Sequence, residues 1–274
     1  MMKEIPEGQE TGALVGVYQD LRTFCRVPYV SSLQRHVATM PGCLEYAWAI
    51  CRPGFASGRI PRTAWRLAQT VDDEAFPRLT RPALELMGVD DVGLAAIRNV
   101  CENFVRVAPI NLLFAGLVER LLDGATPGND IEPEDVWRPP PMLPSMPPMQ
   151  PMEALDDAVR SVLMQVSTEI GGEPFVPGLY RLFAPWPAYL AHAATLIEPR
   201  VRSDAGRRSR RVIADRIVAA ADGVLPHLAH APHDLSPPDP AQAKAIISAI
   251  HTYRVTSPEM VVIGSLLLDA LPAR

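Results

Sequence analysis

The stretch PYVSSLQRHVATMPGCLEYAWAICRP, residues 28–53, recurs later in the chain as PFVPGLYRLFAPWPAYLAHAATLIEP, residues 174–199. The two segments align without a gap, and nine of the 26 positions are identical. A second pair follows in the same order at a nearly equal offset, with FVRVAPINLLFAGL from Phe104 matching YRVTSPEMVVIGSL from Tyr253. Two collinear matches of this kind indicate two diverged copies of one structural unit.

Around these segments the apolar residues recur at helical spacing, as in DDVGLAAIRNVCENFV and SRRVIADRIVAAA. No segment combines sustained alternation of apolar and polar residues with hairpin turns, so we expect little or no sheet. Prolines favour the first turn of a helix, and we expect helices to begin at Pro41, Pro109, Pro187 and Pro258. The sequence therefore predicts an all-α protein.

Nine prolines fall among the 25 residues from Pro127 to Pro151. Because proline lacks a backbone donor and fixes φ, this stretch is expected to be an extended linker. Its apolar side chains, Trp137 and three methionines among them, should keep the linker on the surface of the units that it joins. We predict a first helical repeat over 1–126, a linker over 127–152 and a second helical repeat over 153–274. Together they would form a covalent pseudo-dimer with a pocket between the repeats.

Composition narrows the class of protein. The chain has 274 residues, 48% of them apolar, and a formal charge of -5, which gives no general attraction for nucleic acid or for an anionic membrane. The four cysteines are widely spaced, and reduced, buried thiols are expected. The acidic start MMKEIPEGQETG does not resemble a signal peptide, which predicts a cytoplasmic protein. As partners we expect a small-molecule ligand, no nucleic acid and no membrane; a homodimer is a further hypothesis.

The repeat segments, with Leu-Tyr-Arg-(x)3-Pro-Trp-Pro-x-Tyr-Leu from Leu179, resemble the group I 2-haloacid dehalogenases over roughly residues 14 to 271. That family is all-helical and built from two repeats joined by a linker. In it an aspartate of the second repeat activates the water that displaces the halogen directly, and an asparagine of the first repeat helps to hold this water. The resemblance therefore implies a cofactor-free hydrolase with its active site between the repeats.

Transferred to this sequence, the resemblance gives a mixed result. The position of the catalytic aspartate falls on Leu179, which cannot take a proton, while the helper asparagine matches Asn111. The resemblance implies that the substrate-binding positions are those that differ in character from the family or flank the base position: Ser31, Gln34, Phe114, Pro177, Gly178 and Tyr180. The scaffold residues are kept while the chemistry is altered.

These observations leave three hypotheses open. The chain is a dehalogenase-like enzyme that has ceased to be an active 2-haloacid dehalogenase, or a family member that catalyses another transformation or only binds a ligand, or a helical partner protein. If catalysis persists, a replacement acid or base is expected beside the repeat segments, with these candidates: His36, Glu45, Glu169, Glu173 and His192.

We expect no metal and no cofactor. The spacing of His227, His230 and His233 resembles a metal cluster, but Pro226 and Pro232 break any helix that would place the three on one face. Arg35 and Arg181 occupy equivalent repeat positions and could bind a substrate carboxylate, although structural ion pairing is the more common role.

Overall fold

The computed structural model describes residues 3–69, 74–131, 133 and 137–273. Its helices and strands, in chain order, are α1 (Ala13–Cys25), α2 (Ser32–Val37), α3 (Cys43–Ala56), α4 (Arg59–Ala68), α5 (Arg81–Leu86), α6 (Asp91–Leu122), the short 3-10 helix Met152–Ala154, α7 (Asp157–Gln165), β1 (Thr168–Ile170), β2 (Glu173–Phe175), α8 (Gly178–Arg181), α9 (Pro187–Arg202), α10 (Asp204–Val224), the 3-10 helix Leu225–His227 and α11 (Pro240–Ala270). The fold class is all-α, as predicted.

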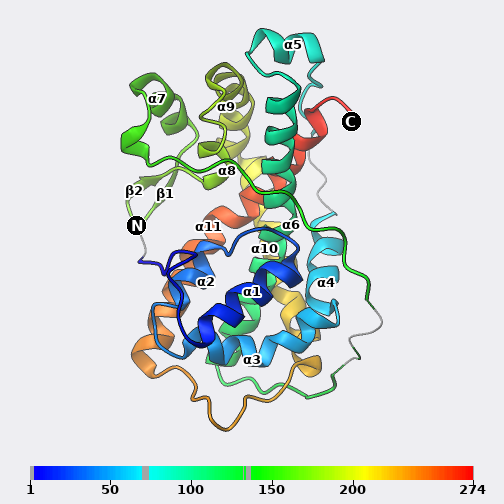
Figure 1. Cartoon of the computed structure of the whole chain (residues 1–274), viewed down its shortest axis with the longest axis vertical. Helices are drawn as coiled ribbons and strands as arrows, with labels where there is room; N and C mark the ends of the chain where they lie inside the picture. The colour runs from blue at the N-terminus through cyan, green and yellow to red at the C-terminus, as the bar shows by residue number, and fades with distance from the viewer. Residues whose placement is uncertain (1–2, 70–73, 132, 134–136, 274) are drawn as a thin grey trace.

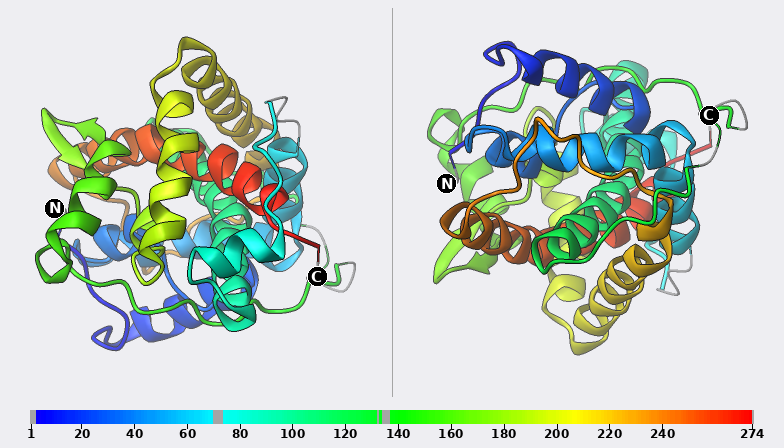
Figure 2. Two further views of the ribbon diagram at one scale, coloured as in Figure 1. Left: turned by 90° about the horizontal axis from the view of Figure 1, so that it is seen from above. Right: turned by 90° about the horizontal axis from the view of Figure 1, so that it is seen from below.

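The order of elements is similar before and after the linker. In each half a helix is followed by a very short helix, two further helices and a long helix that ends the half, and the first half has the additional short helix α5 before α6. Figure 1 shows α1 to α4 in the lower part of the molecule and α7 to α9 in the upper part. The long helices α6 and α11 pack along each other, and α10 packs against both. The views of Figure 2 show α11 crossing the molecule beside α6, so this pair joins the two parts.

Two predicted helix starts are wrong. Pro109 lies inside α6 and Pro258 lies inside α11, so two helical segments expected to be separate form one helix of 32 residues around Pro109. A proline in a helix interior removes one backbone hydrogen bond, a cost that continuous burial on both sides offsets. Beside this break, the indole of Trp65 donates to the carbonyl of Arg106 at 2.8 Å. Pro187 does stand in the first turn of α9, whereas α3 begins at Cys43, after Pro41.

The small antiparallel sheet was not anticipated. β1 pairs with β2 from Thr168 opposite Phe175 to Ile170 opposite Glu173. The turn between the strands is Gly171-Gly172, with φ of +61° and +84°. Glycine adopts such values at little cost, and a turn of two left-handed residues matches the twist of a hairpin. The Gly-Gly pair was therefore the local signal for a hairpin that the helical pattern obscured.

The proline-rich linker lies across both parts of the molecule, as its apolar content predicted. Polar side chains of α6 donate to its carbonyls: Arg106 to Pro141 at 2.7 Å and Asn99 to Ser145 at 2.8 Å. Prolines supply acceptors without donors, so side-chain donors from the helix are the natural partners of this segment. Residues 132 and 134–136 of the predicted linker lie outside the described residues.

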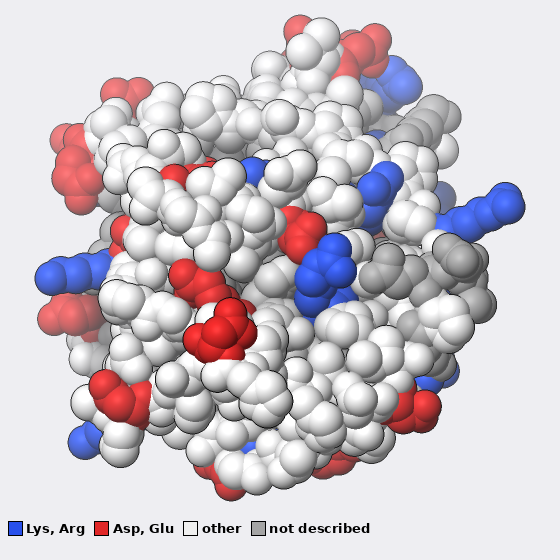
Figure 3. Space-filling model, turned by 60° about the horizontal axis from the view of Figure 1, so that its bottom comes forward, with Lys and Arg blue, Asp and Glu red and all other residues white. Residues whose placement is uncertain are grey.

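The surface and the thiols agree with the composition. On the face shown in Figure 3, acidic and basic side chains are scattered over a largely uncharged surface. Cys25, Cys43, Cys51 and Cys101 are all buried and unpaired, as predicted. Burial raises the pKa of Cys25, Cys51 and Cys101 to about 12, so these thiols stay protonated at neutral pH. None of the described helices is both long enough and apolar enough to span a membrane.

Candidate active site

A cavity of about 750 Å³ lies between the two halves of the chain. We call it the inter-half cavity. Its walls come from aligned positions of the two repeat segments and from the linker. Seven aligned pairs line it on both sides: Pro28 and Pro174, Tyr29 and Phe175, Ser31 and Pro177, Ser32 and Gly178, Phe104 and Tyr253, Val107 and Thr256, and Ala108 and Ser257. The cavity thus lies where the two halves of the chain meet, and ligand sites are common at such places.

A chain of polar side chains reaches this cavity from the buried interior. Gln34 donates from Nε2 to Asn111 Oδ1 at 2.7 Å, and Asn111 donates from Nδ2 to the Tyr253 hydroxyl at 3.2 Å. Ser31 donates from Oγ to Gln34 Oε1. Ser31, Gln34 and Asn111 are all buried, and because each is hydrogen-bonded the network carries little desolvation penalty. The structure therefore brings together three of the predicted site residues.

The network ends at Tyr253. Tyr253 is enclosed by protein, and burial raises its pKa, while hydrogen bonds with Ser257, Asn111 and Ser31 lower it in part. Tyr29 lies beside it on the cavity wall, and burial raises the pKa of Tyr29 well above its usual value, with a further contribution from Tyr253. Both phenols are consequently neutral at physiological pH, so they act as hydrogen-bonding groups rather than as bases.

The charged groups on the cavity wall are few. Arg35 pairs with Glu4 at 2.8 Å and lies 3.8 Å from Glu7, which fits the structural role considered for it. Glu173 also lines the cavity, on β2. Arg181, the residue aligned with Arg35 in the second repeat segment, donates to the carbonyl of Gln150 at 2.6 Å. The formal charge around the cavity is therefore negative.

Gly178 and Leu179 point in different directions. Gly178 lines the cavity, and a side chain built there would begin 3.3 Å from Phe104 and 3.7 Å from Met149. Leu179 is fully buried and does not line the cavity. One of its methyl groups lies 3.8 Å from the point at which a side chain on Gly264 of α11 would begin. Leu179 therefore packs into the contact between α8 and the long helices.

Two other predicted residues also lie behind the cavity wall. Phe114 is buried in the first half, with its ring centroid 6.2 Å from that of Phe55. Tyr180 donates its hydroxyl to Glu259 Oε1 at 2.6 Å, a buried pair on the second half that parallels the Gln34–Asn111 pair on the first. Neither Phe114 nor Tyr180 lines the cavity, whereas Pro177, Gly178 and Ser31 do.

The Tyr180–Glu259 pair gives a pH-dependent prediction. Glu259 is 1% exposed, and burial raises its pKa from 4.5, opposed by the hydrogen bond from Tyr180 and by Arg210. Because the folded state holds the Glu259 proton more tightly than the unfolded state, protonated Glu259 favours the fold fully below pH 4.5. This contribution is lost as the pH rises through the pKa of Glu259 in the folded state. Above pH 4.5, Glu259→Gln is therefore expected to gain stability relative to wild type, by up to about 1.4 kcal/mol per pH unit between the two pKa values.

Urea unfolding of both proteins from pH 4 to pH 8 measures this difference. Asp222→Asn, at an exposed carboxylate, is the control that should show no growing gain. A constant difference between Glu259→Gln and wild type at every pH would show that Glu259 ionises normally.

Most of the candidate replacement acids and bases lie elsewhere. Glu173 lines the cavity, but His36, Glu45, Glu169 and His192 do not. The Nδ1 of His36 lies 2.7 Å from the carbonyl of Lys3, in contact with the N-terminal segment. The described part of the chain holds no cluster of three His, Cys, Asp or Glu side chains that could hold a metal ion.

Sequence reasoning missed most of the apolar wall. Met146 and Met149 of the linker, with Met260 of α11, line the cavity beside Phe104 and Phe175. The sequence did offer one indication of this wall, because Phe104 and Tyr253 are the first residues of the second pair of aligned segments. The tyrosines Tyr29 and Tyr253 were visible in the quoted segments as well, but nothing in the sequence placed both on one cavity wall.

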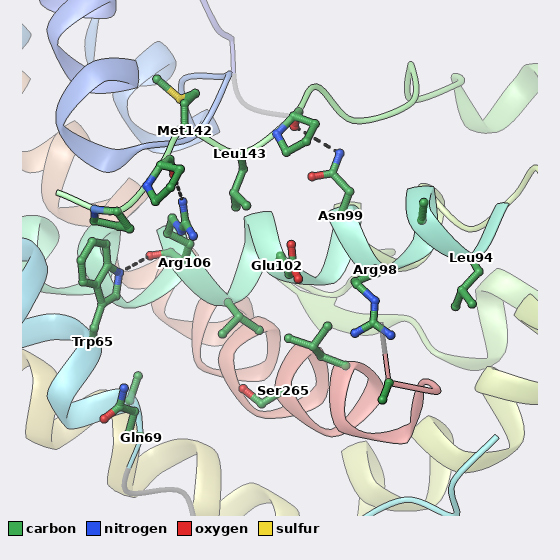
Figure 4. Close-up of a pocket in the computed structure, with 18 of the residues that line it drawn as sticks. Trp65, Gln69, Leu94, Arg98, Asn99, Glu102, Arg106, Met142, Leu143 and Ser265 are labelled. Carbon is green, nitrogen blue, oxygen red and sulfur yellow. Dashed lines mark hydrogen bonds between the residues drawn. The ribbon is translucent and has the colours of Figure 1, made fainter. Parts of the chain in front are cut away.

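A larger cavity, of about 1110 Å³, lies between α4, α6, the linker and the end of α11. Figure 4 shows Arg98, Glu102 and Ser265 at its base and Trp65 at one side. None of the predicted site residues lines it. Arg98 donates to the carbonyl of Pro272, and Arg106 donates to the carbonyls of Pro141 and Arg26, so two of its arginines bind backbone. We therefore take the inter-half cavity as the candidate active site.

Comparison with known proteins places this geometry in context. No family model matches the chain. The (R)-2-haloacid dehalogenase of Pseudomonas putida is 26% identical over 237 residues, which cover 82% of this chain and 77% of that protein. A solved D-2-haloacid dehalogenase mutant in complex with D-2-CPA covers 98% of this chain and 96% of its own, with a TM-score of 0.76 and 22% identity.

A D-2-haloacid dehalogenase complexed with L-LA matches with the same identity of 22%, the same coverage and a TM-score of 0.74. The solved structures share the fold of this chain over nearly its whole length, and the curated relative adds the sequence match. This chain is therefore similar in sequence to a 2-haloacid dehalogenase, and it shares its fold with solved 2-haloacid dehalogenases.

Proposed function

We propose that this protein binds a small organic molecule in the inter-half cavity and acts on it without a cofactor, but does not hydrolyse 2-haloacids. The observation that carries the proposal is the position of Leu179. The resemblance assigns the catalytic base to this residue, which has no proton acceptor and packs behind the cavity wall. The lining carboxylates are Glu4, which is paired with Arg35, and Glu173.

The buried polar network supports a ligand site over a docking role. A docking protein has no need of an amide and hydroxyl chain that ends at an internal cavity, whereas an orienting site does. The proposal includes two repeats, 1–126 and 153–274, that form a pseudo-dimer around the cavity and are joined by the linker 127–152. It also includes a cytoplasmic location and the loss of the hydrolytic base, with Asn111 kept as a positioning group.

Halide release from both enantiomers of 2-chloropropionate tests the proposal. A positioned general base typically contributes about 10²–10⁴-fold, so wild-type turnover is expected to stay at the background rate. Asn111 accepts and donates hydrogen bonds but cannot hold the proton of the attacking water. The Pseudomonas putida relative, assayed under the same conditions, is the positive control.

Turnover above background, abolished by Glu173→Gln, would contradict the proposal. It would show that the catalytic carboxylate has moved to β2. Turnover that survives Glu173→Gln would also contradict it, and would point to Glu4 or to a base outside the described cavity wall.

A further inference from the structure

The charged side chains of the inter-half cavity leave negative charge without a partner. Among the described residues, those that line the cavity and carry a charge are Glu4, Glu173 and Arg35. Arg35 pairs with Glu4 at 2.8 Å and lies 3.8 Å from Glu7, so its positive charge is already balanced. Glu173 is exposed, and its side chain makes no ion pair or hydrogen bond within the described part of the chain. A bound molecule therefore meets a carboxylate that is still open to a cation.

Aromatic side chains stand beside this carboxylate. Phe104 and Phe175 line the cavity together with Tyr29 and Tyr253. Phe175 is 39% exposed, although phenylalanine is among the residues most often buried. It follows Glu173 by two residues on β2, so the carboxylate and the ring project from the same face of the strand. The face of an aromatic ring attracts a cation, and a carboxylate beside the ring adds to that attraction.

The rest of the wall suits an apolar body. Met146, Met149 and Met260 line the cavity, and the flexible thioethers of methionine adapt to varied shapes. Met149 is 45% exposed, so its side chain is accessible to a bound molecule. A volume of about 750 Å³ is in the range that encloses molecules much larger than a short haloacid. The occupant therefore needs an apolar body of roughly bicyclic size next to its charged group.

We propose that the inter-half cavity binds an organic cation, an alkylated or protonated amine with a large apolar body. The ammonium group lies against the Glu173 carboxylate and the ring of Phe175, and the apolar body packs against Phe104 and the methionines. This inference rests on the proposed ligand site, and it names the class of ligand. A carboxylate ligand, such as the acids that the relatives are named for, is repelled by the same wall.

Competition against prodan, a fluorescent and uncharged naphthyl ketone, tests the inference on the full-length chain. Three competitors share the naphthalene body: (2-naphthylmethyl)trimethylammonium is a cation, 2-acetylnaphthalene is uncharged and 2-naphthoate is an anion. The ammonium is expected to bind about three- to tenfold more tightly than the ketone, the combined effect of one cation–π contact and one exposed ion pair. The naphthoate is expected to bind most weakly.

Glu173→Gln separates the charge from the shape of the cavity. It should weaken the ammonium about two- to fivefold, strengthen the naphthoate and leave the ketone unchanged, because only the charged competitors feel the carboxylate. Phe175→Leu keeps the wall apolar but removes the ring, so it should weaken the ammonium more than the ketone.

Glu169→Gln is the matched control. Glu169 is an exposed acid on β1 of the same hairpin, but it does not line the inter-half cavity, so its removal should change no competitor at about 0.15 M salt. An ammonium that binds no more tightly than the ketone, or an equal loss of all three competitors in Glu173→Gln, would overturn the inference while leaving the ligand site intact. If calorimetry and fluorescence find no binding of prodan or of any competitor, the proposed site itself is overturned.

Discussion

Leu179→Asp is expected to unfold far more readily than wild type and to gain no halide release. The side chain of Leu179 is fully buried, and its methyl group lies 3.8 Å from where a side chain on Gly264 would begin. A carboxylate there would stand in an apolar contact, and an unpaired buried charge typically costs about 3–5 kcal/mol. Such a loss is a large share of the roughly 5–15 kcal/mol by which domains are stable.

Leu179→Asn is the matched control, because it removes the same apolar contacts without adding a charge. The aspartate variant should be less stable than the asparagine variant at pH 8, and the gap should close as the pH falls and the carboxyl group is protonated. Urea unfolding measures both. Gly178→Ser, whose side chain would point into the cavity, should be far milder. A stable Leu179→Asp variant that releases halide would show that residue 179 faces the cavity.

The second large effect is expected at Gly58, which caps α4 with φ of +76°. A side chain there would begin 2.1 Å from the ring of Trp137 in the linker. Gly58→Ala should therefore cost about 1–2 kcal/mol for the left-handed backbone and a further 1–3 kcal/mol for displacing the indole. Thermal or urea unfolding gives the value.

Gly88 provides the control, since its φ is +75° and no atom lies within 4 Å of the position of an added Cβ. Gly88→Ala should show the backbone cost alone. In a Trp137→Ala background, Gly58→Ala should fall to the same cost as Gly88→Ala. If Gly58→Ala costs no more than Gly88→Ala in wild type, the linker does not press on α4 at this point.

The all-α class and the position of the cavity followed from the repeat because paired segments such as Pro28 with Pro174 line the same space. The interior prolines could not be placed. A proline at the start of a helix and one within a buried helix leave the same local pattern, and only the packing of α6 against α11 separates the two cases.

The site was predicted in part for a related reason. The resemblance to the 2-haloacid dehalogenases assigned Ser31, Gln34 and Asn111 to one pocket, and hydrogen bonds join the three side chains in the structure. The sequence could not show that the side chains of Leu179 and Tyr180 point away from the cavity. In α8, a helix of only four residues, neighbouring positions face different directions. The sequence also could not place the linker methionines at the cavity. Side chains of α6 and α8 hold the linker backbone there by donating hydrogen bonds to the carbonyls of Ser145 and Gln150.

A crystal structure of the wild-type chain grown with 2-acetylnaphthalene tests most directly the claim that the inter-half cavity is the functional site. The expected result is ligand density between α2 and α8, with its rings beside Phe104 and Phe175. Density instead in the larger cavity beside Arg98 and Glu102, or an inter-half cavity closed by its own side chains, would contradict the account.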